Sequence, residues 1–350
     1  MEKPVLLRHL AGEPTDRFPV WLMRQAGRYL PRYQKIRSDH SFWEMVQSPQ
    51  LVSEITLLPL EVAPVDGLVF FSDILTWPRG AGVTIAMDEK GGPSILEPLQ
   101  TCEAFERHFE NFDPQKHVPY VGEALAEVRL RMPQNATLIG FAGGPWTLAT
   151  YLSDTRQGRQ LGQSRWMQQW AKRDYEGCVQ ALRLLAECTW RYVQFQIQSG
   201  AQLIQIFDTW ISELPSQNVE GLVTAYVEIL ADLFRRIQAT GTPGIYFFKG
   251  HFPSMASLSQ VPCAALSVGP EHSLSSWEAI LGGCHALQGN LDPMVLLAGP
   301  EVVRFKTQQL VAEARKLKHP AILNLGHGVL PQTPVEAVSC FVQEAQQVWM

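Results

Sequence analysis

Two arginines in the N-terminal part of the chain have the type and spacing needed to bind an anionic ligand. Arg24 and Arg28 follow the apolar run 19–23 and are four residues apart, which places two side chains on one side of a helical turn. A guanidinium group can hold a carboxylate through two parallel hydrogen bonds. The pair therefore predicts a carboxylate-binding site; the alternative is an exposed helix with two solvated arginines.

Asp73 and His327 also stand directly after apolar runs. Asp73 follows two phenylalanines, so its carboxyl is expected to be partly desolvated and to have a shifted pKa, as functional groups often do. The alternative is an aspartate that caps a turn. His327 lies between two glycines, which favours access; it could donate a hydrogen bond, carry charge or bind a metal, or simply occupy a turn.

Motifs for metals, nucleotides and covalent catalysis are missing from the sequence. The glycine-rich segment 140–147 has neither the GxGxxG nor the Walker pattern, and the chain contains no HExxH, GxSxG or CxxC. We therefore predict an enzyme without a metal site or a cofactor. The six scattered cysteines are expected to be reduced thiols, which suits the cytoplasm.

Charge and hydropathy narrow the possible partners. The formal net charge is −5, which argues against nucleic acid, so an anionic ligand would need local positive groups in a cleft. No run of about 18 apolar residues predicts a membrane span. The N-terminus does not resemble a signal peptide, and we expect a cytoplasmic protein.

Short apolar runs alternate with helical patterns along the whole chain, as in folds with a parallel sheet. Helical periodicity is found in residues 165–196, 222–237 and 335–349. The apolar runs, bounded by Gly, Pro or Asp, are 19–23, 67–71, 137–141, 202–207, 244–248, 264–268, 285–289 and 321–325.

Eight such runs predict an α/β fold, a single (β/α)8 TIM barrel spanning residues 1–350; the alternative is an open, doubly wound sheet. A small β-hairpin, formed by 83–87 and 95–99, is expected as an insertion after the second strand. In a barrel the loops after the strands share one rim. The polar residues expected at that rim are Arg24, Arg28, Ser72, Asp73, Asp208, Thr209, Lys249, Asn290, Asp292 and His327.

Six motifs together resemble the uroporphyrinogen decarboxylase family over nearly the whole chain. The most distinctive is PVWLMRQAGRYLPRYQKIR, residues 19–37. FFSDIL, GFAGGPWTLATYL, IFDTW, LQGNLDP and NLGHGV follow in the family's order and approximate spacing. The resemblance implies a cofactor-free decarboxylase of haem biosynthesis that acts on uroporphyrinogen. It also implies a homodimer whose two clefts face one another.

The resemblance also implies roles for individual residues. Asp73, Arg24 and Arg28 would be catalytic: Asp73 would bind the pyrrole N–H groups, and the arginines would face the substrate carboxylates. Substrate contacts are expected from Arg24, Gln25, Ala26, Gly27, Arg28, Asp73, Tyr151, Thr209 and His327, with Tyr33, Arg37 and Phe71 lining the same cleft.

The chain departs from the family pattern in two places. Thr209 stands where many members have serine, which keeps the hydroxyl. Residues 265–269 read Ala-Leu-Ser-Val-Gly where many members have Gly-Leu-Asp-Trp, so an acid and an indole are lost from the expected rim after the sixth strand.

Two other functions remain open from the sequence. A corrinoid-dependent methyltransferase on a related barrel would use zinc bound by Cys and His, and a spaced His-x-Cys set is missing here. A non-catalytic tetrapyrrole carrier would bind the same ligand without converting it, and the presence of Asp73, Tyr151 and His327 argues against it.

Overall fold

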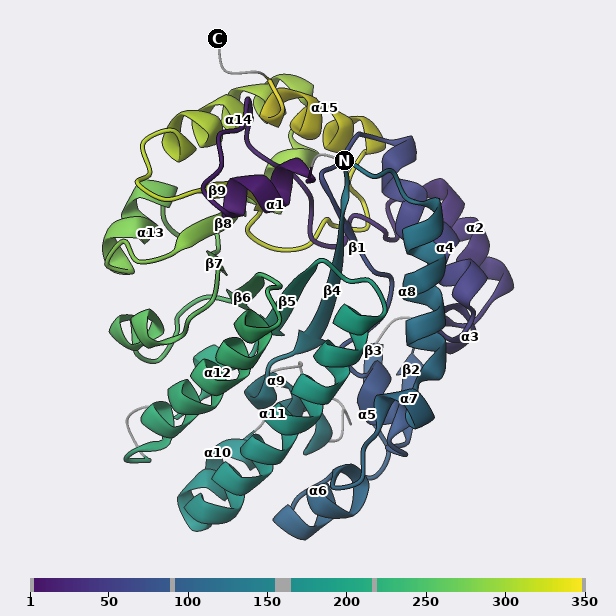
Figure 1. Cartoon of the computed structure of the whole chain (residues 1–350), viewed down its shortest axis with the longest axis vertical. Helices are drawn as coiled ribbons and strands as arrows, with labels where there is room; N and C mark the ends of the chain where they lie inside the picture. Colours follow the sequence, from purple (N-terminus) through teal and green to yellow (C-terminus); the bar gives the residue numbers. More distant parts are fainter. Residues whose placement is uncertain (1–2, 89–91, 155–164, 216–218, 348–350) are drawn as a thin grey trace.

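A curled sheet of parallel strands forms the centre of the molecule. A computed structural model describes residues 3–88, 92–154, 165–215 and 219–347. Within them, seven strands form one sheet in the order β1-β4-β5-β6-β7-β8-β9, so each strand lies beside the next along the chain (Figure 1). The strands are β1 (Gly67–Val69), β4 (Thr137–Gly143), β5 (Leu203–Asp208), β6 (Gly244–Phe248), β7 (Ala265–Ser267), β8 (Ala286–Leu291) and β9 (Ala321–Leu325).

Helices connect the strands and cover the outer face of the sheet (Figure 1). Several begin with proline, whose fixed φ and missing N–H suit the first turn. They are α1 (Val5–Leu10), α2 (Pro31–Asp39), α3 (Phe42–Gln47), α4 (Pro49–Leu57), α5 (Thr76–Gly80), α6 (Cys102–Phe109), α7 (Pro114–His117), α8 (Pro119–Arg131), α9 (Pro145–Leu152), α10 (Arg165–Arg173), α11 (Tyr175–Gln198), α12 (Leu222–Ala239), α13 (Leu274–Ile280), α14 (Pro300–Ala314) and α15 (Val335–Ala345). None in the described ranges is long and apolar enough to span a membrane.

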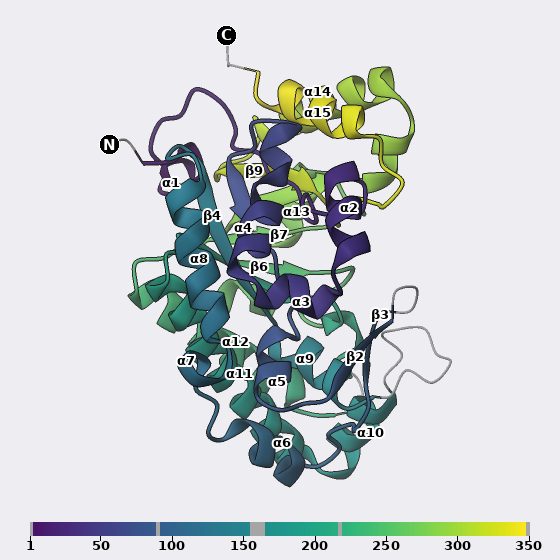
Figure 2. The same ribbon diagram turned by 90° about the vertical axis from the view of Figure 1, so that its right-hand side faces the viewer.

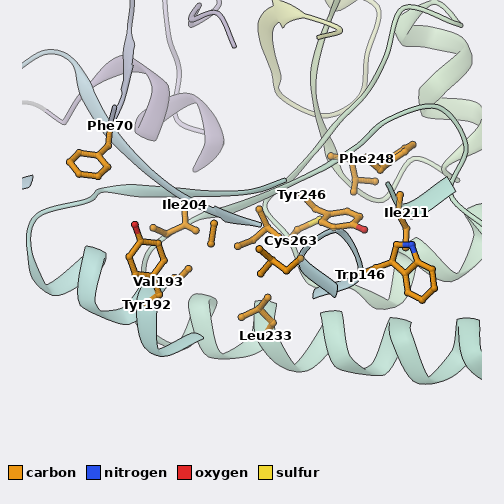
Figure 3. Close-up of a cluster of buried hydrophobic side chains, with 14 of the residues drawn as sticks. Phe70, Trp146, Tyr192, Val193, Ile204, Ile211, Leu233, Tyr246, Phe248 and Cys263 are labelled. Atoms are coloured by element: carbon orange, nitrogen blue, oxygen red, sulfur yellow. The ribbon is translucent and has the colours of Figure 1, made fainter. Parts of the chain in front are cut away.

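Both faces of the sheet are buried, which explains why its strands read as continuous apolar runs. Tyr246 and Phe248 of β6 belong to the large cluster between the sheet and the outer helices (Figure 3). Ile245 and Phe247, the alternate residues of the same strand, belong to a second cluster on the other face. That second cluster takes side chains from β4 to β9, so it fills the inside of the curl.

Seven of the eight expected strands are present, with ends within two residues of the predicted runs. The first run, 19–23, forms only one isolated bridge, between Val20 and Leu323 of β9. The eight-stranded barrel is therefore not confirmed, and the fold is a curled sheet of seven parallel strands.

Backbone and side-chain hydrogen bonds together hold segment 19–23: the N–H of Trp21 donates to the Leu323 carbonyl (3.3 Å), and the N–H of Leu323 donates to the Pro19 carbonyl (2.9 Å). Pro19 has no N–H, the N–H of Val20 donates to the Asp66 carboxylate (2.8 Å), and that of Met23 donates to the Asn324 side chain (3.0 Å). Asp66, the residue before β1, also donates its own N–H to the Val20 carbonyl (2.8 Å). The segment is thus held between β9 and the start of β1 without forming a regular strand.

A hairpin is present as an antiparallel pair, β2 (Ile85–Asp88) and β3 (Gly92–Ile95). The first strand overlaps the predicted run 83–87, but the second ends at Ile95, where the predicted run 95–99 begins, so the predicted bounds of that arm are wrong. The hairpin stands apart from the main sheet near the edge of the molecule (Figure 2). The long helical pattern 165–196 is divided into α10 and α11, because Asp174 caps the second helix by accepting the N–H of Gly177 (3.0 Å). The pattern 222–237 corresponds to α12, and the pattern 335–349 corresponds to α15 as far as Ala345, with residues 348–349 outside the described ranges.

Asp66 provides a test of how segment 19–23 is held. Its carboxylate accepts two hydrogen bonds from Arg17 (both 2.7 Å) besides the one from Val20, and it is 4% exposed. Asp66→Ala leaves a guanidinium and a backbone N–H without their acceptor, so we expect the free energy of unfolding to fall by about 3 kcal/mol. Urea denaturation measures this loss.

Asp232→Ala is the matched control for that measurement. Asp232 also contacts arginines, but its side chain is 59% exposed, so the expected loss is below about 1 kcal/mol. Equal losses for the two variants would mean that Asp66 does not hold the segment.

Candidate active site

The predicted site residues lie after the carboxyl ends of the strands, on one edge of the curled sheet. Arg24 follows segment 19–23, Asp73 follows β1, and Tyr151 lies in α9 after β4. Thr209 is the first residue after β5, and His327 is the second residue after β9. The parallel direction of the strands brings these positions to the same rim, as the sequence predicts.

Arg24 has a left-handed backbone conformation, with φ of 61°, an uncommon value for a residue other than glycine. Two glycines make room for it. A Cβ at Gly27 would lie 2.8 Å from the Arg24 carbonyl oxygen, and a Cβ at Gly328 would lie 2.3 Å from Cδ of the Arg24 side chain. The arginine therefore lies across the backbone of the glycine that follows His327.

Asp73 stabilises a turn through one oxygen of its carboxyl group, and it also interacts with the charge of Arg24. Its Oδ1 accepts the N–H of Leu75 (2.8 Å), as expected of an aspartate in a turn, and its N–H donates to the Thr76 hydroxyl (3.2 Å). The side chain is only partly exposed, and desolvation raises the pKa of the carboxyl, while the Leu75 N–H and the charge of Arg24 act in the opposite direction. No described residue donates a hydrogen bond to Oδ2.

His327 lies close enough to Arg24 to be affected by its charge. Burial, followed by the charges of Arg24 and Lys249, lowers the pKa of the imidazole to about 4. Its Nδ1 accepts the N–H of Gly328 (2.6 Å), so in the neutral ring the proton is on Nε2. His327 is therefore a neutral hydrogen-bond donor at pH 7.

The expected cleft-lining residues form a neighbouring group. The rings of Tyr33 and Phe71 meet edge to face, with centroids 5.7 Å apart. Burial raises the pKa of the Tyr33 hydroxyl, and the positive charges of Arg37 and Arg28 oppose that rise. The two arginines are thus close to this aromatic pair, whereas Arg24 acts on Asp73 and His327.

Tyr151 and Thr209 lie on the elements that follow β4 and β5, the two strands next to β1 in the sheet. The Tyr151 ring contacts Trp210 edge to face, with centroids 6.3 Å apart. The N–H of Trp210 donates to the Thr147 hydroxyl (3.0 Å), which fixes the loop after β5 to α9. Thr209, between Asp208 and Trp210, is partly buried.

Within the segment 24–28, the side chain of Gln25 does not point to a ligand. It is 1% exposed, accepts the N–H of Leu22 (3.0 Å) and donates to the carbonyl of Gly67 (2.8 Å). Gln25 therefore fastens the arginine segment to the first residue of β1. Ala26 and Gly27 are partly exposed, and only their backbone can offer polar contacts.

Asp208 differs most from the expectation that it lies on the rim. It is fully buried, and its carboxylate accepts hydrogen bonds from the N–H (3.1 Å) and hydroxyl (2.6 Å) of Thr147 and from the hydroxyls of Tyr226 and Tyr246. Burial raises the pKa of this carboxyl, and these hydrogen bonds oppose the rise. Buried tyrosines need a polar partner, and that is the signal in the sequence that could have indicated this network.

The glycine-rich segment 140–147 is not an anion-binding loop. β4 continues to Gly143 and α9 begins at Pro145, so Gly144 alone connects them. A Cβ on Gly144 would lie 2.5 Å from Cγ of Asp208, which explains why a glycine is needed there. A separate cavity of about 410 Å³ beside α5 and α7, lined by Arg79 and Tyr120 among others, contains none of the predicted site residues.

No group of three His, Cys, Asp or Glu side chains in the described ranges could hold a metal ion.

Comparison with known proteins identifies the family. The family model for uroporphyrinogen decarboxylase (URO-D) matches residues 1–348. The chain belongs to the uroporphyrinogen decarboxylase family.

Curated relatives agree with this assignment over almost the full length. The uroporphyrinogen decarboxylase of Thioalkalivibrio sulfidiphilus is 36% identical over 99% of this chain and 97% of its own. That of Thermus thermophilus is 35% identical over 98% of both chains. The enzyme of Salinibacter ruber is also 35% identical, over 98% of this chain and 95% of its own.

Solved structures show the same fold in proteins of other names. A methyltransferase from Methanosarcina mazei has a TM-score of 0.76 at 18% identity, covering 98% of both chains. A putative vitamin-B12-independent methionine synthase from Listeria monocytogenes has a TM-score of 0.56 at 13% identity, covering 99% of this chain and 98% of its own. At these identities the likeness concerns the fold alone.

The segment 265–269, which departs from the uroporphyrinogen decarboxylase pattern, keeps an ordered rim. The Gly269 carbonyl accepts hydrogen bonds from the Trp277 indole (2.9 Å) and from the Asn290 side chain (2.8 Å). A tryptophan on α13 thus lies against the loop after β7.

The His327 imidazole should titrate near pH 4. Between pH 6.5 and about 4, the His327 imidazole is protonated in the unfolded chain but neutral in the folded chain. The free energy of unfolding therefore falls as the pH decreases through this window. The full contribution is about 3 kcal/mol. An NMR titration, with His327→Gln to assign the signal, measures the pKa; a value near 6.5 would contradict this description.

Gly328→Ala should displace the Arg24 side chain without unfolding the protein, because the clash falls on a flexible arginine. As the guanidinium moves away, the pKa of His327 should rise above the parent value. In the Arg24→Gln background the same glycine change should add little, since the two changes act through one contact. An additive effect in the double variant would show that Gly328 acts independently of Arg24.

Proposed function

We propose that this chain removes the carboxyl groups from the four acetate side chains of uroporphyrinogen III, giving coproporphyrinogen III and four CO2 in porphyrin and haem biosynthesis. The family match over residues 1–348 supports this activity. The observation that carries the proposed mechanism is a desolvated Asp73 carboxylate with one uncommitted oxygen, next to Arg24.

The reaction needs a place for the electrons that remain when CO2 leaves. A pyrrole can accept them itself if its α-carbon is first protonated, because the ring then becomes a cation. Loss of CO2 from the adjacent acetate restores neutrality and leaves an exocyclic methylene. A second proton converts this methylene to a methyl group, and the α-carbon releases the first proton. No external electron sink is required, in contrast to many decarboxylations.

Asp73 suits the stabilisation of that cation. With Oδ1 bound to the Leu75 N–H, the carboxylate is fixed before substrate arrives, and fixed charge in a desolvated site stabilises a developing opposite charge most effectively. The pyrrole N–H groups would donate to Oδ2. The raised pKa of Asp73 places the acid limb of activity above the usual range of aspartate, since the carboxylate must be ionised.

Arg24, Arg28 and Arg37 supply positive charge for the substrate carboxylates, which number eight in uroporphyrinogen and four in coproporphyrinogen. Arg24 faces Asp73 and His327, while Arg28 and Arg37 lie beside Tyr33. Neutral His327 would donate its Nε2–H to a substrate oxygen. Tyr151 and Thr209 would contact the macrocycle from the elements that follow β4 and β5. Arginine is a poor acid at neutral pH, so we assign it no proton transfer.

The same proposal includes a catalytic cycle without metal or organic cofactor, a cytoplasmic location and one domain over residues 1–350. It also includes a complete (β/α)8 barrel, in which segment 19–23 would be the first of eight strands, and a homodimer.

Dialysis against a chelator should leave turnover unchanged, and sedimentation should report twice the chain mass. Activity lost on dialysis and restored by zinc would instead favour the methyltransferase alternative.

Incubation of the purified chain with uroporphyrinogen III tests the activity directly. Chromatography of the oxidised products should show the seven-, six- and five-carboxyl intermediates, followed by the four-carboxyl product. Binding of the substrate without any loss of carboxyl groups would contradict the proposal and favour a tetrapyrrole carrier.

A further inference from the structure

Lys249 stands at the same rim, although none of the proposed roles uses it. It directly follows Phe248, the last residue of β6. Phe248 is in register with Asp208 of β5, so the next residues of the two strands are Lys249 and Thr209. On the other side, the ring of Phe247 contacts the His327 imidazole edge to face, with centroids 6.2 Å apart. The strand thus places Lys249 between two predicted substrate-binding residues.

The Lys249 ammonium is an exposed cation beside other cations. No hydrogen bond or ion pair joins it to another residue within the described ranges, whereas Lys316 contacts Glu313 (2.5 Å) and Arg236 contacts Glu187 (2.6 Å). The charges of Lys249 and Arg24 both act on the His327 imidazole, so the two cations share one region. Like charges gathered at one edge of the sheet, in a protein of net charge −5, create a local field that attracts an anion.

We propose that Lys249 binds a carboxylate of the substrate at the rim between Thr209 and His327. This inference rests on the proposed function, because a substrate with eight carboxylates needs more positive groups than Arg24, Arg28 and Arg37. An ammonium is a point charge on a flexible stem, so it suits a mobile side-chain carboxylate rather than the fixed, two-pronged contact of a guanidinium.

The expected effect is on substrate affinity rather than on the chemical step. A carboxylate contact at the rim is the same in the ground state and in the transition state, so its loss raises KM and leaves kcat unchanged. Because Lys249 is exposed, the contact is screened, and KM for Lys249→Gln should rise by roughly 3- to 10-fold at low salt and less at high salt.

Three variants of the full chain test this proposal in steady-state assays with uroporphyrinogen III. Lys249→Gln removes the charge, and Lys249→Arg keeps it. Lys306→Gln is the matched control, since Lys306 is an exposed lysine on the outer helix α14. NMR titration of His327 in each variant reports whether the Lys249 charge lies where the structure has it, independently of turnover.

The proposal predicts a raised KM with unchanged kcat for Lys249→Gln, near-parent values for Lys249→Arg and Lys306→Gln, and a higher His327 pKa in Lys249→Gln only. Parental turnover with an unchanged KM for Lys249→Gln would overturn this inference and leave the proposed function intact. A fall in kcat at unchanged KM would also overturn it, because Lys249 would then act on the chemistry. If the parent chain does not convert uroporphyrinogen, both proposals fail.

Discussion

The position of Arg24 is the constraint on which the site depends. Segment 19–23 is held by backbone hydrogen bonds to β9 and by the side chains of Asp66 and Asn324, and Arg24 follows it in a left-handed conformation. Gln25 fastens the next residue to β1, and Gly328 leaves room for the arginine side chain. Arg24 is thereby fixed between the loops after the first and last strands of the sheet, and its charge reaches both Asp73 and His327.

In this position the charge of Arg24 changes the pKa values of both Asp73 and His327. It opposes the desolvation that raises the pKa of Asp73 and so favours the ionised form of this partly buried carboxyl. It adds to the desolvation that lowers the pKa of His327, so the imidazole stays neutral and donates through Nε2. The same cation thus favours a negative group at Asp73 and a neutral donor at His327, which suits the proposed substrate with its cationic transition state and many carboxylates.

The sequence predicts the strands well, because buried parallel strands are short apolar runs bounded by Gly, Pro and Asp; β6 and β9 match their predicted runs residue for residue. The sequence also predicts that the residues following the strands lie at one rim, because this follows from the parallel direction of the strands alone. What the sequence does not reveal depends on partners that are distant along the chain. In segment 19–23 the N–H groups of Val20 and Met23 donate to the side chains of Asp66 and Asn324, and the buried carboxylate of Asp208 accepts hydrogen bonds from Tyr226 and Tyr246. The left-handed backbone at Arg24 has no local signal, because the residue is not glycine.

The central claim is that the negative charge of Asp73 offsets a pyrrole cation in the transition state, and Asp73→Asn tests it most directly. Asparagine keeps the acceptor oxygen for the Leu75 N–H, so the turn and the fold should survive, and a thermal melt on the same sample verifies this. The account predicts that kcat and kcat/KM for uroporphyrinogen fall together by roughly 100-fold or more, about 3 kcal/mol. A folded variant that retains the parent kcat would contradict the account.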